Sequence, residues 1–234
     1  MDKLPKYKPT DKMIDLIGDN YSLLQVMSRF GLSLGFGDKT VKEVCEMNNV
    51  DCQTFLVVVN FMAEGFSRMD GSADDISIPA LVDYLRQAHI YFLDYCLPAI
   101  RRKLIEAIDC SQDDVSFLIL KFFDGYMREV RKHMEYEEKT VFKYVDTLIH
   151  GNAPKNYQIS TFSKHHDQVG ERLTELKNII IKYCPAKANT NVLNAALFDI
   201  YACEEGLESH CKVEDYLFVP AILKLERRMR ENEK

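Results

Sequence analysis

A histidine followed four residues later by a glutamate occurs twice in this chain, each time inside a long apolar heptad stripe. The two copies are His133 with Glu137 and His210 with Glu214. Residues four apart on an α-helix project from the same face, one turn apart. Each copy therefore presents an imidazole and a carboxylate on one side of a helix, and such a pair suits a transition metal.

The apolar stripes predict four long helices joined by short connections. These helices are expected over residues 77–108, 111–150 and 156–184, and from 191 to beyond 227. No segment shows the alternation typical of a strand. The predicted fold is therefore all-α, with an up-down-up-down four-helix bundle. Pro98 and Pro220 predict kinks in the first and the fourth helix.

A small helical N-terminal domain is expected before the bundle, over residues 1–66. Its shorter helices are predicted over residues 11–30, 39–48 and 52–64. Gly31 is suited to end the first of them. Residues 67–76 have linker composition, and the bundle takes residues 77–234. Because the N-terminal domain is too small to bury a large core alone, we expect that it packs on the bundle or mediates homodimerisation.

Composition excludes several classes of partner. The 234 residues carry a net charge of −6, which argues against nucleic acid and anionic membranes as partners. The first residues lack the apolar core of a signal peptide, and the most apolar run, residues 55–63, is too short to span a membrane. Seven cysteines, with no Cys-x-x-Cys pair, indicate reduced thiols in a cytoplasmic protein.

Each of the four stripes contains a histidine at a similar depth. His89 lies ~19 residues before the end of the first helix, and His133 lies ~21 residues after the start of the second. His166 lies ~18 residues before the end of the third helix, and His210 lies ~20 residues after the start of the fourth, so their depths also agree within one turn. We therefore expect one layer that contains six side chains: His89, His133, Glu137, His166, His210 and Glu214. His165 and His150 lie outside the stripes and are not predicted ligands.

Two carboxylates inside an apolar bundle are costly unless a positive charge pairs with them. No lysine or arginine occupies the stripes near this layer, whereas two divalent metal ions would supply the charge. Mixed histidine and glutamate ligation suits iron or manganese, and the lack of thiolate ligands argues against structural zinc. Six ligands on two ions would leave positions open for water, O2 or NO.

The segments around these residues resemble the di-iron repair-of-iron-centres proteins, also known as regulators of cell morphogenesis and nitric-oxide signalling. The similarity covers most of the chain. The similar segments are Leu81–Leu85 leading to His89 with Leu97-Pro98, His133–Glu138 with Val141-Phe142, His166–Glu171, and His210–Glu214 with Leu217, Phe218 and Pro220. The resemblance implies a hemerythrin-like bundle that holds two iron ions through the same six side chains. Carboxylates and an oxo or hydroxo group would bridge the two ions.

One departure from that family concerns its Cys-Cys-Gly-Gly element, which follows Arg-x-Gly-Ile. Here Arg29–Leu32 leads to Gly35-Phe36-Gly37-Asp38, and both cysteines are absent. This weakens any version of the function that transfers electrons or iron through those thiols.

The resemblance implies a response to nitrosative or oxidative stress. The chain would repair damaged iron–sulfur clusters, donate iron, or carry out NO or O2 chemistry at the di-iron site, with iron–sulfur proteins as partners. An alternative is a hemerythrin-like O2 or NO sensor or carrier without turnover. The residues leave open whether the chain is an enzyme, such as an NO reductase or a peroxidase. A bundle without metal is the remaining alternative.

Overall fold

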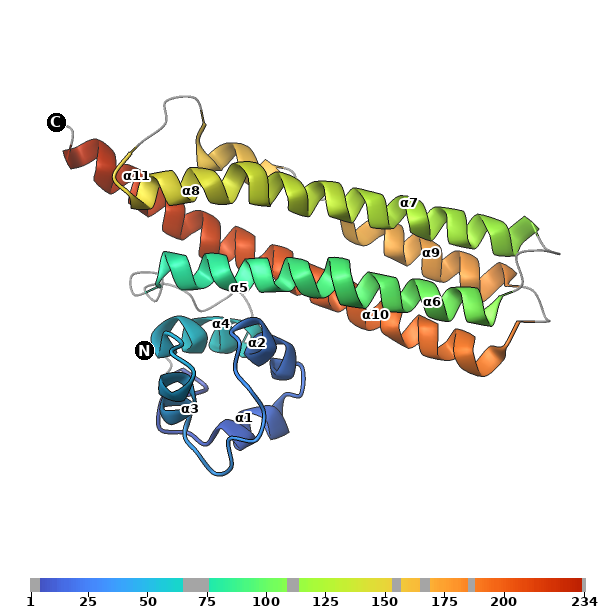
Figure 1. Ribbon diagram of the computed structural model, residues 1–234, viewed down its shortest axis with the longest axis horizontal. Coiled ribbons are helices and arrows are strands. Elements are labelled where there is room, and N and C mark those ends of the chain that lie inside the picture. The colour runs from blue at the N-terminus through green and yellow to red at the C-terminus, as the bar shows by residue number, and fades with distance from the viewer. Residues whose placement is uncertain are drawn as a thin grey trace. The chain divides into compact units, whose positions relative to one another are not determined.

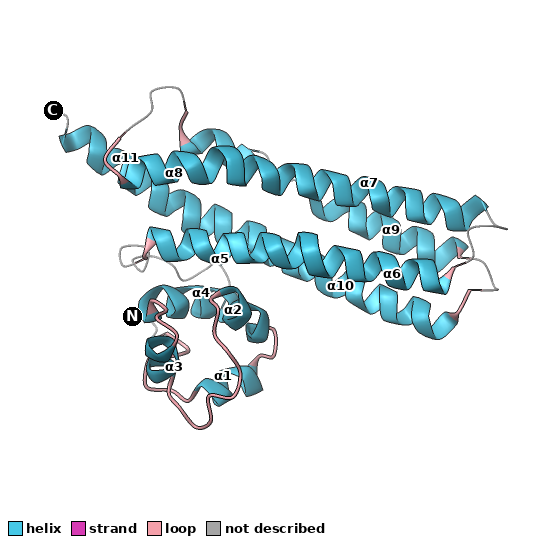
Figure 2. Ribbon diagram, in the orientation of Figure 1, coloured by secondary structure: helices cyan, strands magenta, loops and turns pink. Residues whose placement is uncertain are grey.

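The computed structural model describes residues 5–64, 76–108, 114–152, 157–164, 169–184 and 188–232. Every regular element in these ranges is helical, and one isolated bridge between Lys12 and Thr40 is the sole β-type pairing found there (Figure 2). The all-α prediction is therefore confirmed. None of the described helices combines the length and the apolar character needed to cross a membrane.

Contacts divide the chain into two compact units. One comprises residues 1–88 and 212–234, and the other comprises residues 89–211. The domain boundaries expected from the sequence remain a prediction. Residues 67–75 of the expected linker lie outside the described residues.

The unit over residues 89–211 contains most of the four-helix bundle (Figure 1). Its α-helices are α6 (Leu97–Ala107), α7 (Asp114–Tyr136), α8 (Phe142–Ile149), α9 (Val169–Tyr183) and α10 (Thr190–Val213). Helix α7 contacts both α6 and α9 along their lengths. At the bundle surface, Arg101 pairs with Asp124 at 2.6 Å, and Lys103 pairs with Asp199 at 2.6 Å. The first helix is thus tied to both the second and the fourth, and the predicted bundle is confirmed.

The predicted apolar stripes form the core of this unit. Phe92, Phe123, Leu173 and Ile200 come from four different helices, and each is completely buried. Full burial of a side chain of this size contributes about 1.5–3 kcal/mol to the free energy of folding. The histidines and glutamates predicted as ligands therefore belong to stripes whose other members are core residues.

The start of the third helix differs from the prediction. A single α-helix was expected over residues 156–184, whereas the structure has a 3-10 helix, η5 (Ile159–Lys164), and then α9. Residues three apart lie directly above one another in a 3-10 helix. Ile159 and Phe162 therefore project to the same side of η5, and both are buried. Ser111, the predicted cap of the second helix, lies outside the described residues.

Within the described ranges, three π-helical turns interrupt the long helices. They are η3 (Tyr91–Cys96), η4 (Glu137–Val141) and η6 (Glu214–Phe218). In each, an N–H donates to the carbonyl five residues earlier, as Phe142 does to Glu137. Two of these turns end two residues before Pro98 and Pro220, where kinks were predicted. The wider turn accommodates a ring that would otherwise clash with the carbonyl four residues back.

The first unit contains four short N-terminal helices. They are α1 (Met13–Asp19), α2 (Leu23–Arg29), α3 (Val41–Met47) and α4 (Cys52–Glu64). The prediction of a single helix over residues 11–30 is wrong, because the helix is interrupted between α1 and α2. Asn20 is extended, and its side-chain oxygen accepts from the N–H of Ser22 at 3.1 Å. Such a local side-chain turn competes successfully with a continuing helix.

The N-terminal helices contact α5 (Ile78–Ile90) and η6 within the same unit. Arg29 donates to the Tyr84 hydroxyl at 3.2 Å, and the Ser77 N–H donates to Thr54 at 2.8 Å. The rings of Phe61 and Tyr216 lie 6.3 Å apart. These contacts give the N-terminal helices a core shared with α5 and η6, while homodimerisation stays a prediction.

Gly31 ends α2 in the left-handed conformation, with φ of +72°. The Leu32 N–H donates to the Met27 carbonyl and the Gly31 N–H donates to the Ser28 carbonyl, which is the Schellman pattern. The predicted helix stop is confirmed.

Gly31→Ala is expected to lower the free energy of unfolding by about 1–2 kcal/mol, because a Cβ is strained at this φ. Urea unfolding would measure the loss. Gly18→Ala is the matched control: Gly18 lies within α1 and has open space where a Cβ would be. It should be neutral or stabilising by up to about 1 kcal/mol. Equal effects of the two substitutions would contradict the role assigned to Gly31.

Candidate metal centre

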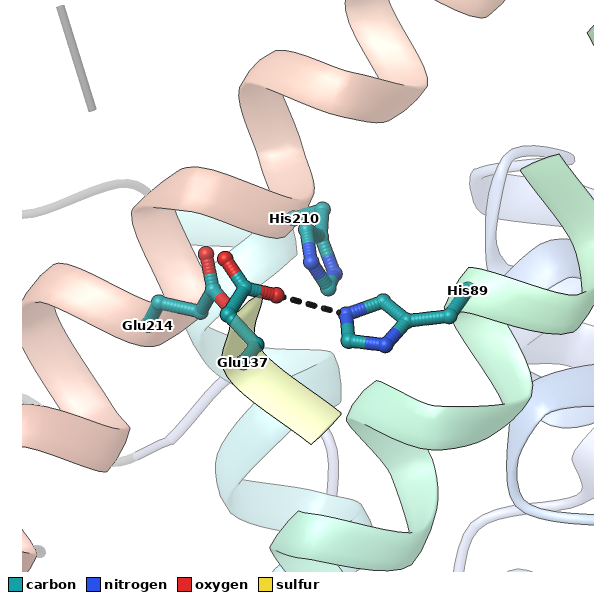
Figure 3. A group of neighbouring side chains, drawn as sticks. All are labelled: His89, Glu137, His210 and Glu214. Carbon is teal, nitrogen blue, oxygen red and sulfur yellow. Dashed lines mark ion pairs between the residues drawn. The ribbon is translucent and has the colours of Figure 1, made fainter. Parts of the chain in front are cut away.

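Four of the predicted ligands meet in one buried cluster: His89, Glu137, His210 and Glu214 (Figure 3). They come from α5, η4, α10 and η6. One ligand atom from each lies within 4.8 Å of those from the others, and all four residues are buried. Two atoms that each lie ~2.1–2.4 Å from one ion cannot be more than ~4.8 Å apart, so this spread fits coordination of a metal ion.

Glu137 lies between two histidines from different helices. Its Oε2 is 2.8 Å from Nε2 of His89, and its Oε1 is 2.7 Å from Nε2 of His133. His133, on the last turn of α7, is therefore brought to the cluster as predicted. Through its two oxygens, Glu137 therefore links His133 to His89 on another helix.

The second ring nitrogen of His89 also has a carboxylate partner. Nδ1 of His89 lies 2.9 Å from Oε1 of Glu138, and the ring stacks on Phe142 with centroids 5.5 Å apart. A carboxylate on the far nitrogen orients a metal-binding histidine and leaves its other nitrogen available to the metal. Glu138 was missed by the sequence reasoning because it lies one residue off the apolar stripe.

The electrostatics of the cluster demand a positive partner. Glu137 and Glu214 are both completely buried, and burial of a charged carboxylate is costly. Burial by itself raises the pKa of Glu137, but His133 and His89 offset this and hold that pKa below its usual range. Glu137 is therefore a carboxylate at neutral pH. Carboxylates and imidazoles with this geometry form a donor set for a metal such as iron or manganese.

The π-turns are located at the ligands. Glu137 and Glu214 are the first residues of η4 and η6, and His89 lies two residues before η3. Single π-turns within α-helices frequently occur at functional sites. The two His-x-x-x-Glu copies thus share a local structure as well as a sequence pattern, with the histidine on the α-helix and the glutamate opening the π-turn.

The third helix contributes no described ligand. His166 and its neighbour His165 lie outside the described residues. The set of six ligands therefore remains a proposal, in which five members have described positions at or next to the cluster.

No cysteine joins the described cluster. In the N-terminal helices, Cys45 and Cys52 are near enough to hydrogen-bond, and burial raises the pKa of both thiols. Both are therefore protonated at neutral pH. Protonated thiols are poor nucleophiles and poor metal ligands.

Glu138→Gln is expected to weaken metal binding about 10–100-fold, as losing a carboxylate behind a ligand histidine commonly does. The amide keeps the shape but removes the charge that orients His89. Metal titration followed by elemental analysis would measure the change. Glu135→Gln is the matched control, since Glu135 is exposed and pairs with Lys139. Unchanged affinity in Glu138→Gln would contradict the orienting role.

Comparison with known proteins agrees with the site. A family model described as the hemerythrin HHE cation-binding domain matches residues 80–222. A search of curated proteins gave no significant match. The matched segment covers more than half of the chain and contains the whole described cluster together with the bundle helices that carry it. The chain therefore belongs to the hemerythrin HHE cation-binding family.

Proposed function

We propose that this protein is a non-haem di-iron protein of the nitrosative and oxidative stress response, which helps to restore damaged iron–sulfur clusters. The observation that carries this proposal is the buried cluster of His89, Glu137, His210 and Glu214 within a hemerythrin-family domain. The resemblance of the ligand segments to repair-of-iron-centres proteins supplies the specific role.

The proposed ligands are those expected from the sequence: His89, His133, Glu137, His166, His210 and Glu214. The contacts of Glu137 with two histidines support a pair of ions with a shared carboxylate. Two iron ions bound there would supply redox chemistry and open positions for O2 or NO. The chain's own part is to hold them in a dry site: Phe92 and Phe142, both completely buried, pack against the rings of His210 and His89.

Access to the cluster differs among its histidines. The side chain of His133 is 16% exposed, whereas that of His89 is 4% exposed. We infer that a small ligand, or iron itself, reaches the centre beside His133. Iron donation would then begin with loss of His133, the most exposed of the described histidines in the proposed ligand set.

The test uses the full chain loaded anaerobically with ferrous iron, and an iron–sulfur dehydratase inactivated by NO. Restored dehydratase activity with the loaded protein, but not with the metal-free protein or an equal amount of free iron, is the expected result. Tracking labelled iron would show whether iron moves to the repaired enzyme. A loaded protein that binds two irons but restores no activity would overturn the repair role and leave the metal centre standing.

The thiols favour a second candidate, a hemerythrin-like O2 or NO sensor or carrier without turnover. The chain lacks the Cys-Cys element, and Cys45 and Cys52 are protonated at neutral pH. Reversible spectral changes with NO or O2, with no product and no repair, would support this candidate. Steady consumption of NO or peroxide with an electron donor would instead indicate an enzyme.

A cytoplasmic location is also proposed. The six described cysteines form no disulfide, although Cys45 lies beside Cys52 and Cys96 lies beside Cys203. Free thiols that lie next to each other are typical of a reducing compartment.

A further inference from the structure

Two reduced cysteines face each other inside the bundle, in the unit over residues 89–211. Cys96, at the end of η3, and Cys203, on α10, are both buried, and their thiols are hydrogen-bonded to each other. A single buried cysteine is usually a small core hydrophobe. Two thiols in contact across a helix interface have a further chemistry, because they can join as a disulfide.

The position of this pair is related to the metal ligands by the helix repeat. Cys96 follows His89 by seven residues, and Cys203 precedes His210 by seven residues. Seven residues correspond to two turns, about 10 Å along a helix. The first and fourth helices run in opposite directions, so both cysteines lie on the same side of the ligand layer. The thiols form the next layer of the bundle.

A third polar group belongs to that layer. Tyr126 precedes His133 by seven residues and is completely buried, and its hydroxyl makes no hydrogen bond within the described part of the chain. Burial, and then the neighbouring Cys203, raise the pKa of Tyr126. The layer next to the ligands therefore contains two thiols and a phenol hydroxyl.

The solvent does not reach these thiols directly. Cys96 is 8% exposed and Cys203 is 2% exposed, so a reductant or oxidant dissolved in water has poor access to them. Phe92 lies on the same helix between His89 and Cys96, and its ring centroid is 6.1 Å from that of His210. The nearest redox partner open to the pair is a metal centre two turns away.

We propose that Cys96 and Cys203 form an internal two-electron store that reduces the ferric di-iron centre and becomes a disulfide. The proposal rests on the proposed function, since it requires iron at the ligand cluster. Each thiol loses one proton and one electron, one S–S bond forms, and two ferric ions become ferrous. No separate electron donor is needed for one turnover.

Glu204 provides an exit for the protons. The hydrogen bond from Cys96, burial and the nearby Glu204 carboxylate together raise the pKa of Cys203. The Glu204 side chain is 19% exposed, pairs with Lys177 and accepts from Thr174 at 2.7 Å. Glu204 follows Cys203 directly in α10 and is partly exposed, so we assign it as the group that accepts the proton released by Cys203.

The experiment uses the full chain, loaded with ferrous iron under reducing conditions and desalted without oxygen. A measured pulse of O2 converts the iron to the ferric state, and the sample is then kept anaerobic. Ferrous iron is followed with a chelating dye. After denaturation and alkylation, mass spectrometry maps the disulfides.

Ferrous iron is expected to reappear during the anaerobic period, with two ferrous ions for each Cys96–Cys203 disulfide. Cys96→Ala and Cys203→Ala should each keep the iron ferric while binding it as the wild type does. The double variant Cys45→Ala with Cys52→Ala is the matched control, because that thiol pair lies in the other compact unit, and it should behave as the wild type.

Several outcomes would overturn the proposal. Iron that stays ferric in the wild type while both thiols remain open to alkylation rules it out and leaves the di-iron function intact. Ferrous iron that reappears equally in Cys96→Ala also rules it out, since another group would then be the reductant. A chain that binds no iron overturns the proposed function, and this inference with it.

Discussion

Glu137→Ala is expected to abolish the metal centre. Removal of the carboxylate takes away a group that contacts both His89 and His133 and that the proposed centre requires as a shared ligand. Loss of an outer carboxylate alone commonly costs 10–100-fold in affinity, so loss of this ligand should exceed about 100-fold. For the proposed two-iron centre, elemental analysis should show iron falling from two ions per chain to well below one, with loss of the visible ferric absorption.

Glu135→Ala is the control for this loss. Glu135 lies two residues earlier on the same helix, is exposed and pairs with Lys139 at 2.7 Å. It should bind iron as the wild type does. Circular dichroism of both variants would show that the helices are retained. Full iron content in a folded Glu137→Ala would contradict the proposed centre, because that centre requires Glu137 as a ligand.

Removal of the metal is expected to lower the thermal unfolding midpoint substantially. The metal-free protein must keep Glu137 and Glu214 completely buried, at a cost that bound cations offset. A ligand at ~1,000 times its Kd stabilises the native state by about 4 kcal/mol. For a chain of this size, 1 kcal/mol shifts the midpoint by about 2–4 °C, so the difference should be about 8–16 °C.

Differential scanning calorimetry of iron-loaded and chelator-treated protein would measure this shift. Glu137→Ala provides the control, since chelator should leave its midpoint unchanged. A wild-type midpoint that does not respond to chelation, in protein shown to contain iron, would mean that the buried carboxylates are stabilised by groups other than the metal.

The heptad pattern was sufficient to find most of the described cluster. His89, His210 and the two glutamates occupy positions where a core residue was expected, and a polar side chain at such a position stands out. Glu138 could not be found in this way, because it is about 100° around the helix from Glu137. Its role depends on where the π-turn directs it, and a π-turn has no residue pattern comparable to a heptad.

The break in the first predicted helix escaped the sequence analysis for a related reason. Apolar residues continue at helical spacing from Met13 to Met27, so the periodicity alone does not reveal the turn at Asn20. The turn depends on one side-chain contact with Ser22, and it changes which residues are covered. Leu16 and Leu23 are buried, whereas Leu24 is 40% exposed.

The π-turns at Glu137 and Glu214 have a consequence for insertions and deletions. An α-helix rotates by about 100° per residue, so one extra residue in a turn changes the angular phase of everything after it. The segment before each glutamate can therefore keep the phase that the ligands need, while α8 and the C-terminal helix α11 (Val219–Asn232) keep the phase that their own apolar faces need. Deleting a single residue within η4 or η6 would restore a regular helix but rotate the ligand and the distal core out of register with each other. In these two helices, the length of one turn is thus as constrained as the identity of the ligands.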